Sequence, residues 1–220
     1  MKKTIFALIA ISSLAFFLSK SYAENTENIR QVYVLHGYSA SVDDHWFQYL
    51  KQQLEEDDRT HVTLIAFPDS KYPDMEKWQR TLDQSISKID QNSYFIAHSL
   101  GVITLLKFLE RHETTEIGGV ILVSGFSKPI QGFDTLDEFI VKSQVDVSKL
   151  SKIKHKHVFI SSNDSIVPMS YSVELAQQLN SAYTVIPDAG HFLASDGYVE
   201  FPQVERLLMQ KLNIKINGRL

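Results

Sequence analysis

The chain has 220 residues, of which 44% are hydrophobic and 22% charged, and its formal net charge at pH 7 is −4. This composition is ordinary for a globular domain and excludes an intrinsically disordered chain and a polytopic membrane protein. Because the sequence contains no cysteine, a disulfide framework and a lipid-modified cysteine are excluded as well.

The first 23 residues have the pattern of a secretory signal peptide. Lys2 and Lys3 precede an apolar run over Ile5–Leu18, and the small residues Ser21 and Ala23 follow it. This order of basic, apolar and small residues predicts cleavage after Ala23 and export to the periplasm or the medium. An uncleaved membrane anchor is the alternative, but the run is shorter than the roughly 20 residues that a spanning helix needs.

Removal of this segment makes the remaining chain more acidic. It holds three of the lysines and no acidic residue, so residues 24–220 keep 19 basic and 26 acidic residues and a net charge of −7. A negative chain without a basic cluster is poorly suited to bind nucleic acid or anionic membranes. We therefore expect a small-molecule partner and no stable membrane insertion after cleavage, while the oligomeric state is left open.

Residues 24–220 are predicted to form one α/β domain, since strand-like and helical segments alternate along them. The strand-like runs are nearly continuously apolar, as in parallel strands covered on both faces: Val32–His36, Val62–Phe67, Tyr94–Ala97, Gly119–Ser124, Val158–Ser161 and Tyr183–Ile186. The helical segments carry apolar residues three or four apart: Trp46–Leu54, Met75–Ile89, Leu100–Leu109, Tyr171–Leu179 and Val204–Leu212. This alternation predicts a three-layer sandwich around a mainly parallel sheet.

One connection, residues 125–151, lacks a clean amphipathic helix although it contains several large apolar residues. Two interpretations remain open for it. It is either a crossover segment packed on the domain surface or a partial cap that forms one wall of a substrate pocket.

A nucleophile elbow is predicted where the third strand-like run ends. The turn Ala97-His98-Ser99-Leu100-Gly101 joins this run to a helical segment. In such a turn the central serine is exposed above the sheet edge, and small residues two before and two after it allow the close approach of the neighbouring elements. Alanine replaces the first glycine of the usual G-x-S-x-G pattern and is still small.

A serine hydroxyl needs a histidine base, which an acid must orient. His191 lies between the last predicted strand and the last helix, whereas His155 and His157 precede a strand and so lie at the opposite sheet edge. Asp164 follows the preceding strand and is the expected acid. Two other aspartates, Asp188 and Asp196, remain alternatives for the acid. Asp164 could instead have a structural role in an Asx turn.

Two backbone N–H groups are needed to bind the oxyanion. We expect one from Leu100, at the start of the helix, and one from Tyr38, in the loop after the first strand. Gly37 allows a close approach of that loop, and His36 is expected to brace it. The acidic run Asp43-Asp44-His45 is interpreted as a helix N-terminal cap, and no recognised phosphate loop, dinucleotide fingerprint or zinc signature is found.

These motifs together resemble the small single-domain α/β-hydrolases of the retinoblastoma-binding-protein-nine type. The shared positions, in chain order, are His36-Gly37, Trp46, Pro68, Trp78, Leu82, His98-Ser99-Leu100-Gly101, Asn163-Asp164, Val167-Pro168 and Gly190-His191. The resemblance implies a six-stranded parallel sheet, the triad Ser99, Asp164 and His191, and esterase or aminopeptidase-like activity. Members of that group are expected inside cells, so the predicted signal peptide departs from it.

The sequence thus predicts a serine hydrolase that cleaves a small acyl ester, or else an amide or thioester, with no cofactor or metal. Activity is expected to fall on acidification, because a protonated imidazole cannot act as a base. The alternative is a non-catalytic binding protein on a hydrolase scaffold, since fold alone does not establish activity.

Overall fold

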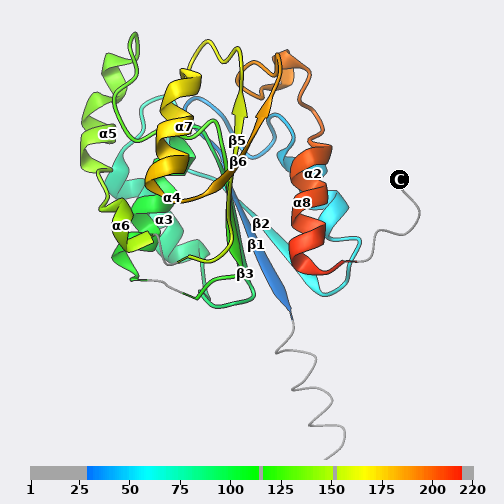
Figure 1. Ribbon diagram of the computed structural model, residues 1–220. Helices are drawn as coiled ribbons and strands as arrows, with labels where there is room; N and C mark the ends of the chain where they lie inside the picture. Colours follow the sequence, from blue (N-terminus) through cyan, green and yellow to red (C-terminus); the bar gives the residue numbers. More distant parts are fainter. Residues whose placement is uncertain (1–28, 114–115, 151–152, 215–220) are drawn as a thin grey trace, which may run out of the picture.

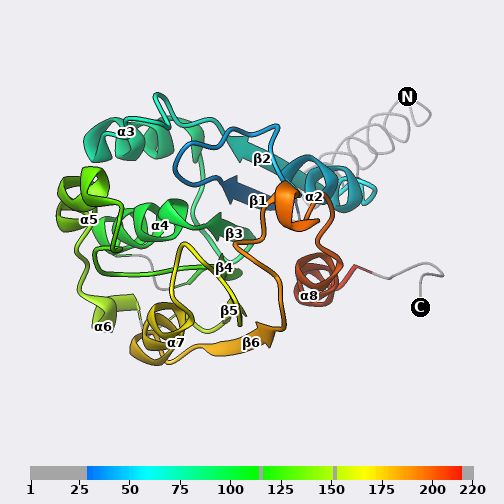
Figure 2. The ribbon, with the colours of Figure 1, turned by 90° about the horizontal axis from the view of Figure 1, so that it is seen from above.

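The computed structural model describes residues 29–113, 116–150 and 153–214, and the predicted signal peptide lies outside them. These residues form three layers, with one sheet between two layers of helices (Figures 1 and 2). Within the described ranges no helix has the length and apolar character needed to cross a membrane.

The central sheet has six strands in the order β2-β1-β3-β4-β5-β6, and every neighbouring pair is parallel. The strands are β1 (Arg30–Leu35), β2 (Thr60–Ile65), β3 (Ser93–His98), β4 (Gly119–Val123), β5 (Lys156–Ser161) and β6 (Ala182–Ile186). Because all strands run the same way, their carboxyl ends meet at one edge, which is the upper edge in Figure 1 and faces the viewer in Figure 2. The predicted fold is confirmed.

Helices cover the two faces of the sheet unequally (Figure 1). One face carries α3 (Met75–Ser85), α4 (Leu100–Arg111), α5 (Asp137–Lys142), α6 (Val147–Leu150) and α7 (Met169–Gln178), and the other carries α2 (Phe47–Leu54) and α8 (Pro202–Leu212). Each face has its own apolar core. Trp78 is fully buried in the first and Trp46 in the second, so both tryptophans are core residues that fix helices to the sheet.

Helix α4 is the most deeply buried helix and begins directly after the predicted nucleophile. Nine of its residues are buried, among them Gly101 and Thr104. Thr104 donates its hydroxyl hydrogen to the carbonyl oxygen of Leu100 at 2.9 Å, so this polar side chain is satisfied inside the helix. The apolar circumference that the sequence shows over Leu100–Leu109 is explained by this position between the sheet and the outer helices.

Two local expectations need correction. The helix predicted over Met75–Ile89 ends at Ser85, because Ile86 adopts an extended conformation. Asp43 and Asp44 do not cap a helix: α2 begins at Phe47 without a side-chain cap. Asp44 instead accepts hydrogen bonds from the backbone and hydroxyl of Ser41, which closes a local turn.

The connection after β4 is not free of helices. It contains a short 3-10 helix, η1 (Asp134–Leu136), followed by α5 and α6. Leu136, Phe139 and Ile140 are buried in the same apolar core as Trp78. These helices are short, which explains why no extended 3.6-residue pattern is visible in the sequence.

Candidate active site

Ser99 occupies the sharp turn between β3 and α4. Its backbone angles are φ 54° and ψ −123°, a region that side chains other than glycine adopt only under constraint. The backbone N–H of Ser99 donates to the carbonyl oxygen of Val123 at 2.9 Å, which ties the turn to the end of β4. This geometry is that of a nucleophile elbow.

Two glycines permit the close packing around this turn. A Cβ atom added to Gly101 would lie 2.5 Å from the carbonyl oxygen of His36, so the start of α4 packs directly on the end of β1. A Cβ on Gly37 would lie 2.9 Å from the Cβ of Ser99 and 3.3 Å from the backbone nitrogen of Leu100. Gly37 therefore allows the loop after β1 to lie against the turn itself, and Ala97, fully buried in β3, precedes it.

The structure brings Ser99, His191 and Asp164 into one hydrogen-bonded chain. His191 Nε2 lies 2.9 Å from Ser99 Oγ, and His191 Nδ1 lies 2.7 Å from Asp164 Oδ2. A carboxylate only accepts, so Nδ1 carries the proton and Nε2 accepts from the serine hydroxyl. The three residues follow β3, β5 and β6 at the carboxyl edge of the sheet, and the side chains of His191 and Asp164 are only 6% and 2% exposed.

The Asp164 carboxylate accepts hydrogen bonds from three further groups besides His191. Oδ1 accepts from the backbone N–H groups of Ile166 and Val167, each at 2.9 Å, and Oδ2 also accepts from the hydroxyl of Ser124 at 2.7 Å. Burial by itself raises the pKa of Asp164, but these hydrogen bonds and that of His191 outweigh it and hold the pKa below its ordinary value. Asp164 is thus an ionised, fixed acceptor.

The loop that carries His191 is fixed by polar groups of its surroundings. Asp196 Oδ2 accepts from the backbone N–H groups of His191 and Leu193 at 2.8 and 3.0 Å. Asn163 Oδ1 accepts from the backbone N–H of Gly190 at 2.8 Å. The rival acid Asp196 therefore acts on the backbone of His191 and not on its ring, while Asp188 is exposed.

Further histidines surround the triad. His98 is buried, its ring lies 4.9 Å from that of His191, and its Nε2 donates to the His191 carbonyl oxygen at 2.8 Å. Burial sets the pKa of His98 well below its ordinary value. His36 accepts from the N–H of Phe67 at 3.1 Å, and its Nδ1 lies 2.9 Å from the carbonyl oxygen of Gly37, so its ring connects the loop after β1 to the chain after β2.

His45, taken from the sequence as part of a cap, instead lies at the site. Its Nδ1 accepts from the backbone N–H of Ala194 at 3.1 Å, which leaves the proton on Nε2. Burial lowers the pKa of His45. Its left-handed backbone, with φ 58°, is not readable from the sequence, and this explains why its position was missed.

The two expected oxyanion donors lie at the same place. Leu100 is the first residue of α4, so no residue of its own helix can accept from its N–H. Gly37 approaches the Leu100 nitrogen closely, and Tyr38 follows it in the loop after β1. Both Leu100 and Tyr38 line one cavity with Ser99 and His191.

This cavity has a volume of about 320 Å³. Besides Ser99, His191 and residues of the loop after β1, it is lined by apolar side chains of the connection after β4: Phe126, Ile130, Phe133 and Leu136. Side chains between residues 126 and 136 of this connection therefore form part of the cavity lining. Its α5 and α6 helices pack on the outside of the domain (Figure 2).

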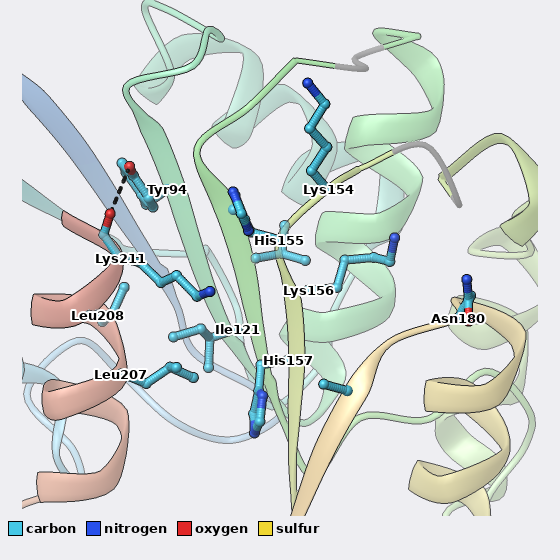
Figure 3. A pocket seen from close by; sticks show the side chains of 13 residues that line it. Tyr94, Ile121, Lys154, His155, Lys156, His157, Asn180, Leu207, Leu208 and Lys211 are labelled. Atoms are coloured by element: carbon cyan, nitrogen blue, oxygen red, sulfur yellow. Dashed lines mark hydrogen bonds between the residues drawn. The ribbon is translucent and has the colours of Figure 1, made fainter. Parts of the chain in front are cut away.

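The histidines that the sequence places at the other sheet edge do lie apart from Ser99. His155 and His157 line a second pocket of about 260 Å³ with Lys211 of α8 and residues of β4 (Figure 3). None of the residues lining that pocket lines the cavity of Ser99. A search of the described residues finds no cluster of histidines and carboxylates able to hold a metal ion.

Residues 32–210 match the serine hydrolase family over most of the chain. The chain belongs to this family. It is also 38% identical over 180 residues to the hydrolase YdeN of Bacillus subtilis, with 81% of this chain and 94% of YdeN covered. The residue types at the site agree with this family, because a serine in a strained turn lies beside a histidine and a carboxylate.

Solved structures share the fold of this chain. The crystal structure of the ydeN gene product of B. subtilis superimposes with a TM-score of 0.79 at 37% identity and covers 84% of this chain and 99% of its own. A YdeN-like hydrolase from Pectobacterium atrosepticum has a TM-score of 0.65 at 20% identity, with 88% and 95% covered. Est1E of Butyrivibrio proteoclasticus, solved with ferulic acid, has a TM-score of 0.63 at 13% identity, with 85% and 91% covered, and is similar in fold alone.

Proposed function

We propose that this serine hydrolase is an esterase that cleaves a small acyl ester through Ser99, His191 and Asp164. The observation that carries the proposal is the continuous chain from Ser99 Oγ to His191 Nε2 and from His191 Nδ1 to Asp164 Oδ2, at 2.9 and 2.7 Å. Both distances lie within the range that proton transfer between a nucleophile and its base needs.

The reaction follows from this geometry. Ser99 Oγ attacks the ester carbonyl carbon while its proton moves to His191 Nε2, and the carbonyl oxygen becomes an oxyanion bound by the N–H groups of Leu100 and Tyr38. The tetrahedral intermediate collapses, the proton returns from His191 to the leaving alcohol, and an acyl-Ser99 remains. Water then attacks the acyl carbonyl carbon while His191 Nε2 takes its proton, and the second intermediate collapses to release the carboxylic acid and return the proton to Ser99 Oγ. Asp164 keeps the imidazole in the required tautomer and stabilises its protonated form.

The lining of the cavity favours ester substrates over the aminoacyl substrates of an aminopeptidase. No carboxylate is found among the described residues that line it, so the ammonium group of an aminoacyl substrate would lose its hydration without gaining an ion pair. Amides and thioesters with apolar acyl groups remain within reach of the same chemistry. The narrower relation to the retinoblastoma-binding-protein-nine type rests on the sequence motifs.

The test is covalent labelling by a fluorophosphonate probe followed by mapping of the modified residue. We expect the adduct on Ser99, and we expect Ser99→Ala to lose both the label and the hydrolysis of nitrophenyl esters. Ser170→Ala, at an exposed serine of α7, is the matched control and keeps both. Full activity in Ser99→Ala would overturn the assignment, and absence of labelling in a folded protein would favour the binding-protein alternative.

We also propose that the enzyme is exported and acts on a small molecule outside the cytoplasm. The basic, apolar and small residues of positions 1–23 support this proposal. N-terminal sequencing of the protein from a cell envelope or culture supernatant is expected to begin at Glu24. A membrane-bound protein that retains Met1–Ala23 would favour the uncleaved anchor instead.

A further inference from the structure

The cavity beside Ser99 has two walls of different chemistry. The loops after β4 and β5 provide aromatic and aliphatic side chains only, namely Phe126, Ile130, Phe133, Leu136 and Ile166. The loop after β1 provides the opposite wall, where Ser39 and His45 are the polar residues and Tyr38 lies next to the predicted oxyanion site. An acyl chain that leaves the scissile carbonyl toward the first wall meets no polar side chain.

The apolar wall is rigid where it is deepest. Phe126, Ile130 and Leu136 are 1%, 5% and 3% exposed and belong to the apolar core on the α4 side of the sheet. These side chains cannot move aside without disturbing that core. The depth of the cavity is therefore set by the fold and not by a loop that adapts to each substrate.

The volume limits how many atoms can be bound. An apolar cavity of roughly 150 Å³ accommodates benzene, which has six carbon atoms. By that measure, a cavity of about 320 Å³ holds about twelve non-hydrogen atoms. With the three non-hydrogen atoms of the ester group seated at Ser99, about nine positions remain for the acyl chain and the first atoms of the leaving alcohol.

The charge of the lining restricts the substrate further. Among the described lining residues there is no lysine, arginine, aspartate or glutamate. A charged acyl group would be desolvated there without a counter-ion, which costs far more than the burial of a methylene contributes. The cavity thus selects against dicarboxylate half-esters as well as aminoacyl groups.

Phe133 is the residue at the open end of the apolar wall. It is only partly buried, unlike Phe126, Ile130 and Leu136 of the same connection, and its ring contacts the ring of Tyr38 edge-on, with centroids 6.2 Å apart and an interplanar angle of 85°. The two rings reach across from the connection after β4 to the loop after β1. A longer acyl chain would have to displace this contact.

We infer that the enzyme acts on esters of uncharged apolar acids of about six to eight carbons, and that Phe133 sets the upper limit of chain length. This inference deepens the proposed esterase function and rests on it. It assigns a substrate class to the cavity and a specificity-determining role to one side chain of the segment 125–151.

The test is a series of nitrophenyl esters from acetate to dodecanoate, assayed with the protein that begins at Glu24. Each methylene that becomes buried is expected to raise kcat/KM roughly fourfold up to the octanoate, and longer esters are expected to fall. Phe133→Ala moves the maximum by two or more methylenes, which raises the decanoate over the octanoate by about tenfold relative to the wild type. Phe133→Trp moves it toward shorter chains. Val141→Ala, at an exposed position of α5, is the matched control and leaves the profile unchanged.

Charge is tested with a pair of similar length. The nitrophenyl hemisuccinate is expected to react at least about a hundredfold more slowly than the nitrophenyl butyrate. A flat chain-length profile, a maximum at acetate, or an unchanged profile in Phe133→Ala would each overturn the inference, while hydrolysis that depends on Ser99 would still support the esterase.

Failure of the esterase proposal is detected separately by binding. The Ser99→Ala variant is titrated calorimetrically with the neutral hexanamide and octanamide and with the succinate ion. The apolar acyl site is supported, even if no ester is hydrolysed, when octanamide binds more tightly than the other two compounds. In the Ser99→Ala background, this binding should be unchanged by Val141→Ala and weakened by Phe133→Trp. Equal or absent binding of all three compounds contradicts it.

Discussion

His98 Nε2 donates a hydrogen bond to the backbone carbonyl oxygen of His191 at a distance of 2.8 Å. This bond joins the residue immediately before the nucleophile to the residue that accepts its proton, across a sequence separation of 93 residues. His98 is buried, and burial holds its pKa well below the ordinary value, so its imidazole is neutral. Besides the bond between Ser99 and His191, an uncharged side chain therefore connects the elbow to the loop of the base.

Replacement of His98 by phenylalanine should separate this positioning role from packing. Phe retains an aromatic ring but leaves the carbonyl oxygen of His191 without its donor, and a buried unsatisfied acceptor costs about 1–3 kcal/mol. We expect a lower urea midpoint, a fall in kcat of about tenfold or more, and a smaller change in KM. The control is His61→Asn, which changes an exposed side chain of β2. A His98→Phe enzyme with unchanged kcat would show that the bond does not position His191.

The two acids near His191 can be distinguished by matched substitutions. Asp164→Asn keeps the shape of the side chain but favours the wrong imidazole tautomer, and we expect kcat to fall by about 10⁴. Asp188→Asn changes an exposed carboxylate only three positions from His191 and is expected to leave kcat within twofold, as is usual for surface positions. The measurement is single-substrate kinetics on a nitrophenyl ester. Equal losses in the two variants would contradict the assignment of Asp164.

The sequence predicts the main features of this site because they depend on chain order. A serine after β3, an aspartate after β5 and a histidine after β6 must meet at one edge once the sheet is parallel. The apolar runs specify the six strands, and their bounds differ from the observed ones by only a few residues. The loop after β1 is similarly fixed by Gly37, whose lack of a side chain is required next to Ser99.

What the sequence does not predict depends on contacts between distant loops. Ser124 bonds to Asp164, and Asp196 bonds to the backbone of His191; a serine or aspartate in a loop gives no sign of such partners. His45 was interpreted as part of a cap because Asp43 and Asp44 precede it, but its left-handed backbone turns it toward the cavity instead. The short helices α5 and α6 are too brief to give a clear period.

Buried histidines make the stability depend on pH. Burial lowers the pKa values of His36, His45 and His98 below the ordinary value of about 6.5. Below that pH the unfolded chain binds protons that the folded protein does not, so the free energy of unfolding falls as the pH is lowered. Above pH of about 7.5 these groups are neutral in both states and contribute no slope.

We therefore expect the urea midpoint to be constant between pH 7.5 and 8.5 and to decrease steadily from about pH 6.5 toward pH 5. His98→Phe should reduce this slope, because His98 has the most strongly lowered pKa of the three. Asp164, whose pKa is also lowered, adds a separate loss only at more acidic pH, as its carboxylate is protonated. A midpoint that rises on acidification toward pH 5 would contradict the burial of neutral histidines.

The oxyanion site is tested most directly at Gly37. Its missing Cβ leaves room for the Cβ of Ser99 at 2.9 Å and for the Leu100 nitrogen at 3.3 Å, so Gly37→Ala must push the loop that carries Tyr38 away from the elbow. Loss of one oxyanion donor lowers kcat by about 10²–10³, and we expect a loss of this size with little change in KM. Gly197→Ala is the control, because it strains the backbone of a left-handed residue, with φ 91°, while its Cβ meets no atom within 4 Å. It should lower the thermal midpoint and leave kcat unchanged. If Gly37→Ala lowered the midpoint equally but retained kcat, the loop after β1 would have no part in binding the oxyanion.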